Sequence, residues 1–372
     1  KVKILYGATA FITVAAMIMG VLGIVSAKTT MVLPGMDGKN PSIEQLLPSD
    51  GEPGGGGIPD PDSEVRGVWI ASVNNINFPS VKGLGISSLK SELDAIVAEC
   101  AADGINAIFF QVRPCSDALY ASTLFPSSEY LTGAQGKDIG FDALGYLTEA
   151  AHAENIKVHA WVNPVRVTFG NQASPAHDTS VLAENNPARL HPEYTVAYAD
   201  GKLYYNLGLS EVRTLIADGV HEIVENYAVD GVVFDDYFYP YTVKVGGKTA
   251  EFDDAAAYKT YGNGKALADW RRENVNALVK LCYDTVKSVR GDCSFGVSPF
   301  GIRLNDDGSN GGSDTSGLEA YNELYCDAKA WIDGGYIDYI APQIYWSFTN
   351  KAARYDTLTR YWNSLCDGTD VD

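Results

Sequence analysis

The chain has 372 residues, of which 46% are hydrophobic and 20% are charged, a composition typical of a globular protein with a buried core. Its formal net charge of -19 argues against a nucleic-acid partner, because phosphate binding needs clustered Lys and Arg, and the sequence has no such cluster. Neutral or cationic ligands are favoured instead, and the 22 Tyr and 6 Trp suit stacking on sugar rings as well as plain packing.

The N-terminal segment is predicted to carry an export signal. Lys1 and Lys3 precede an apolar run over residues 4–27 that ends in small residues, which fits a secretory signal peptide cleaved after Ala27. The run is also long enough to span a bilayer as an uncleaved membrane anchor. Both alternatives predict an exported protein in the cell envelope or outside the cell. Residues 28–63 are rich in Pro, Gly, Ser and Asp and are expected to form a disordered linker.

From Glu64 onward, strand and helix patterns alternate at intervals of about fifty residues, as in βαβ architecture. Short apolar runs predict six strands: Val65–Val73, Ala107–Arg113, Lys157–Val165, Gly231–Tyr239, Ser294–Gly301 and Tyr339–Trp346. Apolar residues spaced at three and four predict a helix after each strand: Leu89–Ala102, Phe141–Glu154, Glu211–Ala228, Ala268–Arg290, Leu318–Ile332 and Ala353–Leu365.

Strands that are apolar on both faces indicate a sheet buried on both sides, either a doubly wound sheet or a closed barrel. Polar residues favour the barrel, since alternation places His159, Trp161 and Asn163 on one face of the third strand, and Gln111 and Arg113 share a face of the second strand. The sequence has no GxGxxG after a first strand and no Walker-type loop, which removes the usual reason to expect a nucleotide fold. Residues 64–372 are therefore predicted to form an α/β domain, a (β/α)8 TIM-type barrel truncated after the sixth strand-helix unit.

The remaining motifs point to no metal and no cofactor. The five His residues include no HExxH, and the six Cys residues include no CxxC. We expect the cysteines to be buried thiols, with a local bridge between Cys282 and Cys293 as the alternative. No GxSxG elbow supports a serine esterase.

The stretch Gly231–Pro240, GVVFDDYFYP, places two adjacent aspartates at the end of a strand that reads as buried. Burying ionised carboxylates costs several kcal/mol, so we expect Asp235 and Asp236 where the barrel opens to solvent. Glycosidic cleavage usually needs two carboxyl groups. Neighbouring residues of a regular strand point to opposite faces, so both reach the cleft only beyond the strand's end. The alternative is a loop cap with an ion pair to Arg113.

Polar and aromatic side chains near the other strand ends complete a predicted polyol-binding cleft. Amides and an Arg would bind hydroxyl groups, and aromatic rings would stack on sugar faces. The predicted substrate-binding residues are Arg113, His159, Trp161, Asn163, Tyr237, Tyr239, Gln343, Tyr345 and Trp346.

Seven blocks in order give the chain its resemblance to the bacterial glycosyl-hydrolase-like family 10: RGVWIAS, GINAIFFQVRP, VHAWVNPVR, GVVFDDYFYP, WRRENVN, GVSPFGI and APQIYW. The resemblance covers residues 64 to 366. A departure is Arg303–Asn305 after the fifth strand, where a Trp often stands in the family.

The resemblance implies an exported (β/α)-barrel glycoside hydrolase whose barrel continues beyond this chain's end. Its polysaccharide substrate would be peptidoglycan glycan strands or related envelope polymers of N-acetyl sugars. By analogy with barrel enzymes that act on such sugars, Asp235 would be orienter or nucleophile and Asp236 the general acid. Because a fold does not guarantee its function, the alternative is a non-catalytic carbohydrate-binding wall protein on the same barrel.

Overall fold

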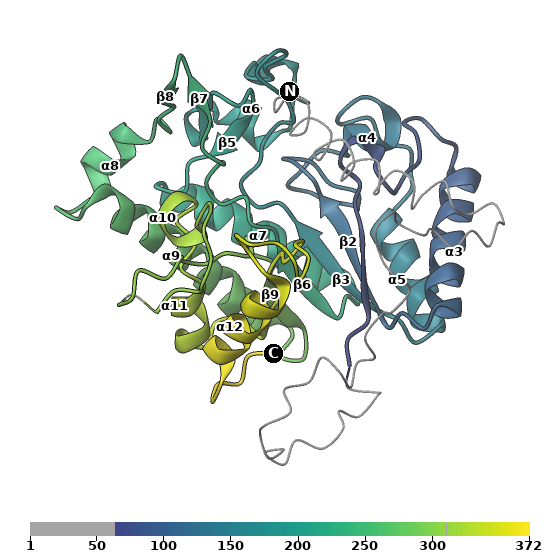
Figure 1. The fold of residues 1–372 in the computed structure, drawn as a ribbon. Coiled ribbons are helices and arrows are strands. Elements are labelled where there is room, and N and C mark those ends of the chain that lie inside the picture. Colours follow the sequence, from purple (N-terminus) through teal and green to yellow (C-terminus); the bar gives the residue numbers. More distant parts are fainter. Residues whose placement is uncertain (1–63, 310) are drawn as a thin grey trace, which may run out of the picture. The chain divides into compact units, whose positions relative to one another are not determined.

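Figure 1 shows the computed structural model, which describes residues 64–309 and 311–372. The fold is that of one unit, Arg66–Asp372. The predicted signal or anchor (1–27) and linker (28–63) lie outside the described residues. Within the described part, no helix is long and apolar enough to cross a membrane.

Six strands form one parallel sheet in the order in which they occur along the chain. All six predicted strands are confirmed, but most end earlier than predicted, because the chain turns into loops at their carboxyl ends. The strands are β1 (Gly67–Ile70), β2 (Ala107–Arg113), β3 (Lys157–Val162), β6 (Gly231–Phe234), β9 (Ser294–Val297) and β10 (Tyr339–Ile340).

The sheet is strongly curled. β2 and β10 are four positions apart in the sheet, which would separate them by about 19 Å if it were flat. Instead, the rings of Phe109 and Tyr339 have centroids 6.4 Å apart, and the Tyr339 hydroxyl lies 2.8 Å from His159 Nδ1. The predicted α/β architecture is therefore confirmed as a curled half-barrel. Among the described residues, the strand pairings run from β1 to β10 and do not close on each other.

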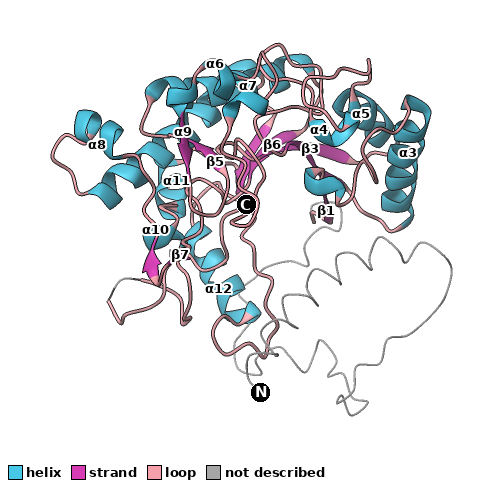
Figure 2. Cartoon of the chain, turned by 90° about the horizontal axis from the view of Figure 1, so that it is seen from above, coloured by secondary structure: helices cyan, strands magenta, loops and turns pink. Residues whose placement is uncertain are grey.

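Helices cover the outer face of this sheet (Figure 2). Strand residues on that face are fully buried, among them Ile108, Phe110, Val158, Val232 and Phe295. Five of the six predicted helices are confirmed as α3 (Ile86–Ala102), α5 (Ala143–Ala153), α7 (Ser210–Asn226), α9 (Leu267–Val289) and α12 (Tyr355–Cys366).

One helix prediction and one covalent alternative are wrong. The helix expected over Leu318–Ile332 is broken into α10 (Ala320–Glu323) and α11 (Ala328–Gly334), because Tyr325 adopts a left-handed φ of 57°. All six cysteines are free, so the Cys282–Cys293 bridge is not formed.

Aromatic rings fill the lower part of the inner face. Trp69 stacks on Phe109 with centroids 4.5 Å apart and meets Trp161 edge-on at 5.1 Å. Gly231 is required beside them, because a Cβ at this position would overlap the imidazole of His159. Aromatic rings and His159 thus fill the base of the inner face, and Asn163 and Asp235 follow at the carboxyl ends of their strands.

Short elements that the sequence did not predict lie in the loops at the carboxyl ends of β1, β2, β3 and β6, and Figure 1 shows those that it labels, such as α4, α6 and β5, at the same end of the sheet. They are α4 (Glu129–Thr132), α6 (Pro187–Leu190), α8 (Ala255–Tyr261), the pair β4 (Thr195–Ala197) and β5 (Leu203–Tyr205), the pair β7 (Lys244–Val245) and β8 (Lys248–Thr249), and three short 3-10 turns, η1 (Val73–Asn75), η2 (Thr179–Val181) and η3 (Pro192–Tyr194).

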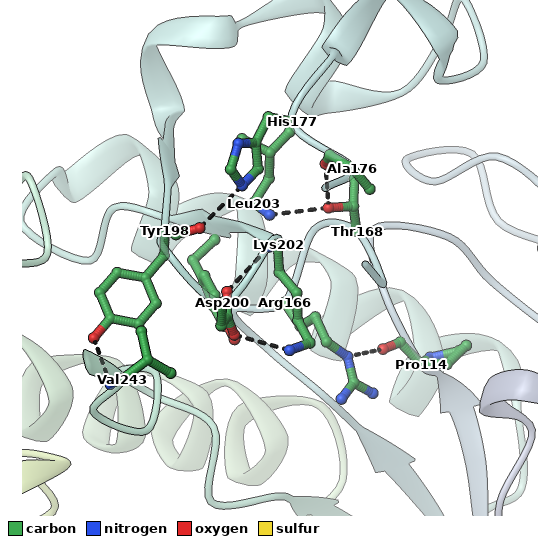
Figure 3. Close-up of polar contacts among 11 residues, drawn as sticks. Pro114, Arg166, Thr168, Ala176, His177, Tyr198, Asp200, Lys202, Leu203 and Val243 are labelled. Atoms are coloured by element: carbon green, nitrogen blue, oxygen red, sulfur yellow. Dashed lines mark hydrogen bonds and ion pairs between the residues drawn. The ribbon is translucent and has the colours of Figure 1, made fainter. Parts of the chain in front are cut away.

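The hairpin of β4 and β5 is tied to its surroundings by hydrogen bonds (Figure 3). Thr168 Oγ1 donates to the Ala176 carbonyl at 2.7 Å and accepts from the Leu203 amide at 2.9 Å. The Tyr198 hydroxyl accepts from the Val243 amide at 3.4 Å. The loops after β3 and β6 therefore form one connected wall beside the strand ends.

Candidate active site

Asp235 follows β6 directly and lies on its inner face, two residues after Val233 of the inner aromatic cluster. Its Oδ2 accepts from Asn163 Nδ2 at 2.9 Å, and its Oδ1 accepts from Gln343 Nε2 at 2.9 Å and from the Asp236 amide at 2.8 Å. The side chain is 8% exposed. Three donors converge on two oxygens, an arrangement that matches a carboxylate, which only accepts.

Asp236 has a different environment. It is 1% exposed, and its Oδ2 accepts a hydrogen bond from the Tyr241 hydroxyl. Its Oδ1 has no hydrogen-bond partner among the described residues. Burial, followed by the charge of Asp235, raises the pKa of Asp236 well above its ordinary value. The strand end thus holds two adjacent carboxyl groups with unequal surroundings: Asp235 accepts three hydrogen bonds, and Asp236 is buried with a partner on one oxygen only.

An aromatic row runs beside the pair. The ring of Tyr237 lies 5.6 Å from that of Tyr241, which lies 6.0 Å from Phe300, which in turn lies 5.7 Å from Trp346. Tyr345 is 76% exposed and lies two residues after Gln343, which donates to Asp235. The structure therefore brings Tyr237, Tyr345 and Trp346 to the same end of the sheet as the carboxyl pair.

Arg166 and Tyr241 are site residues that sequence reasoning missed. Arg166 Nε donates to the Pro114 carbonyl at 2.9 Å (Figure 3), and its guanidinium lies 5.2 Å from the Tyr237 ring centroid. It is 4% exposed. Burial acts to lower the pKa of Arg166, and the charge of Asp235 is among the interactions that raise it. Its place three residues after Asn163, within a block that carries the family resemblance, was the available signal.

Arg113 does not lie at the site, contrary to the prediction. A register shift between Gln111 and Arg113 pairs Arg113 with Val162, so the side chain turns to the outer face. There it is fully buried, and its guanidinium stacks 3.7 Å from the Phe125 ring centroid. The ion pair of the aspartates with Arg113, which was the alternative to a catalytic pair, is not formed in the described structure, and the prediction of ligand contact by Arg113 is corrected.

Two predicted binding residues of β3 lie below the strand ends. His159 pairs with Gly231, the first residue of β6, and is therefore about 13 Å from Asn163 along the strand. Burial lowers the pKa of His159 to about 4, so its ring is neutral. Trp161, which lies between His159 and Asn163 along the strand, packs on Trp69. Of the three, only Asn163 reaches Asp235, and His159 belongs to the base of the half-barrel.

Tyr239 is also displaced from the predicted site. It is 2% exposed and packs between Phe252 at 5.3 Å and Tyr325 at 5.0 Å, with the Arg271 guanidinium 5.4 Å away. Its ring supports the loop after β6 from behind. The predicted contact of Tyr239 with a sugar is therefore corrected to a packing role.

Comparisons with known proteins show similarity to glycosyl hydrolases. The profile of the family described as Glycosyl hydrolase-like 10 matches residues 64–371. The chain is 45% identical over 306 residues to "Glycosyl hydrolase YngK" of Bacillus subtilis (strain 168), covering 82% of this chain and 58% of that protein. It is 36% identical over 316 residues to "Glycosyl hydrolase DigH" of Escherichia coli (strain K12), covering 82% of this chain and 71% of that protein.

Among solved structures, the glycoside hydrolase domain of PgaB (BpsB) from Bordetella bronchiseptica is similar to this chain at 12% identity, with a TM-score of 0.49. The alignment covers 81% of this chain and 80% of that domain.

Proposed function

Because the chain belongs to the glycosyl hydrolase-like 10 family, we propose that it is a glycoside hydrolase acting on cell-envelope glycans. Peptidoglycan glycan strands, or related polymers of N-acetyl sugars, are the proposed substrates. The proposal extends to an exported protein, because the apolar run of residues 4–27 and the Pro/Gly/Ser-rich segment 28–63 precede the fold in the sequence.

The observation that carries the proposal is the unequal pair of carboxyl groups. Asp235 accepts three hydrogen bonds, and Asp236 is buried with a raised pKa. A buried acid with a raised pKa beside a second carboxyl group that accepts hydrogen bonds is a combination suited to glycosidic cleavage.

In this proposal Asp236 gives its proton to the glycosidic oxygen while the bond from that oxygen to the anomeric carbon breaks. Asp235 either attacks that carbon or orients the substrate's own acetamide group for attack, and water then completes hydrolysis. Since Asp236 is 1% exposed and bonded to Tyr241, proton delivery requires this contact to open toward the cleft. Tyr345 and Trp346 would stack on the sugar rings.

The experiment compares substrates with the full-length protein. Intact peptidoglycan, peptide-stripped glycan strands and oligomers of N-acetylglucosamine are incubated with the protein, and new reducing ends are counted. Release from at least one of them is expected. Binding to these glycans without any release would contradict the proposal and favour the alternative, a carbohydrate-binding wall protein.

A further inference from the structure

A line of hydrogen bonds crosses the carboxyl ends of the strands and ends on Asp235. The amides of Ser72 and Val73 both donate to Gln111 Oε1, each at 2.9 Å. Gln111 Nε2 donates to Asn163 Oδ1 at 2.6 Å, and Asn163 Nδ2 donates to Asp235 Oδ2 at 2.9 Å. We call this line, from Ser72 and Val73 through Gln111 and Asn163 to Asp235, the amide relay.

The direction of the amide relay is set at its start. The two ends of a side-chain amide are normally hard to tell apart, but a backbone N–H can only donate. Two backbone N–H groups therefore fix the oxygen of Gln111 toward Ser72 and Val73, and its nitrogen toward Asn163. The same logic then fixes the oxygen of Asn163 toward Gln111, so that its nitrogen faces Asp235.

The amide relay is closed to solvent. Gln111 and Asn163 are each 1% exposed, so water does not replace a donor that is lost inside it. Gln111 also accepts on its main chain, where its carbonyl binds the Ser72 hydroxyl at 2.8 Å. Hydrogen bonds thus hold both the oxygen and the nitrogen of the Gln111 side chain, and Asn163 lies between Gln111 and Asp235.

We propose that Gln111 is a positioning residue, which acts through Asn163 to keep a hydrogen-bond donor pointed at Asp235. It touches neither the substrate nor Asp235, and its role in turnover rests on the proposed function. A second side-chain donor, Gln343 Nε2, reaches Asp235 without passing through Gln111 or Asn163. Gln343 Nε2 also donates to the Ser298 carbonyl at 3.1 Å.

Two substitutions at one position separate direction from packing. Gln111→Glu keeps the shape and both bonds from Ser72 and Val73, but it has no donor for Asn163. The Asn163 amide then turns over to donate to the new carboxylate and presents its oxygen to Asp235. Gln111→Met removes both the donor and the acceptor, and leaves the N–H groups of Ser72 and Val73 without a partner. Unlike Gln111→Glu, it puts no acceptor beside Asn163 that would make the Asn163 amide turn over.

The two variants should therefore rank in opposite orders for kcat and for stability. Gln111→Glu should lower kcat by about 10- to 100-fold, the range found when outer partners of site groups are removed, with KM unchanged because Gln111 does not meet the substrate. Gln111→Met should unfold at the lower urea concentration but keep the higher kcat. Gln172→Glu, at an exposed position, adds the same charge and should leave kcat unchanged.

The test combines kinetics, urea unfolding and NMR of the side-chain amides with Asn labelled by 15N. In the wild type the Asn163 amide protons should exchange slowly with water, and in Gln111→Glu their resonances should move. Wild-type kcat in Gln111→Glu, a lower kcat in Gln111→Met than in Gln111→Glu, or fast exchange of the Asn163 amide would each overturn the relay. If no glycan is hydrolysed by the wild type, the proposed function fails, whereas the amide exchange still tests the relay.

Discussion

Replacement of Asp236 by Asn should stabilise the protein, and the gain should grow with pH. Burial and the neighbouring Asp235 raise the pKa of Asp236 above its ordinary value of 3.8. An acid whose pKa is higher in the folded state stabilises it fully below the unfolded-state pKa, and that contribution is lost as pH rises through the folded-state pKa. An Asn does not titrate, so the variant escapes this loss.

The size of the effect follows from the stoichiometry. One carboxyl group binds at most one proton, so the difference in unfolding free energy between variant and wild type rises by at most about 1.4 kcal/mol per pH unit. The rise begins near pH 3.8 and levels off above the raised pKa. The Asn amide oxygen can still accept from Tyr241, and its nitrogen replaces Oδ1, which has no partner in the described structure.

Urea unfolding of wild type and Asp236→Asn at a series of pH values measures this difference. A matched control of opposite sign is Asp356→Asn, because the hydrogen bonds from Arg354 lower the pKa of Asp356 to about 2. The control variant should lose stability relative to wild type above pH 4, and this loss should fade as pH falls toward 2. A difference for Asp236→Asn that stays flat or falls as pH rises would refute the assignment of a protonated buried acid.

Three further substitutions test separate parts of the structure. Gly231→Ala should cost about 1–3 kcal/mol of unfolding free energy, because the added Cβ overlaps His159; urea unfolding checks it, and an unchanged midpoint would contradict the packing. Arg113→Met should leave glycan hydrolysis unchanged and should not destabilise the protein, since Arg113 stacks on Phe125 and has no ion pair in the described chain. A loss of activity in this variant would show that Arg113 acts at the site after all. Tyr345→Ala should weaken glycan binding by about 0.5–1.5 kcal/mol in calorimetry without changing the urea midpoint, since this ring is 76% exposed, and undiminished affinity would exclude a stacking role.

Local sequence patterns predicted the six parallel strands and five of the helices. The predicted first residues of five strands, among them Ala107, Lys157 and Gly231, are those observed. This success reflects short apolar runs bounded by turn residues, which a buried parallel strand requires. The predicted strands run past the observed ends, because residues such as Asn163 and Asp235 continue the alternating pattern of side chains after the backbone has left the sheet.

The site was predicted only where one strand decides the geometry. Asp235 and Asn163 were found because each directly follows a strand. Arg113 was misplaced because a one-residue register shift reverses the face of every later residue, and alternation in a single strand gives no sign of it. Gln111 was seen as polar but given no role, since its partner Asn163 lies 52 residues away.

The most direct test of the central claim is release of reducing ends from peptide-stripped glycan strands by the full-length wild type, Asp235→Asn, Asp236→Asn and a control, Asp284→Asn. Asp284 is an exposed carboxylate of α9 paired with Lys280. The two site variants should each lose at least about 100-fold in kcat, as removal of a catalytic acid or base does, while the control keeps wild-type activity and all variants still bind the glycan. Equal activity in all four proteins would contradict a catalytic role for the aspartate pair.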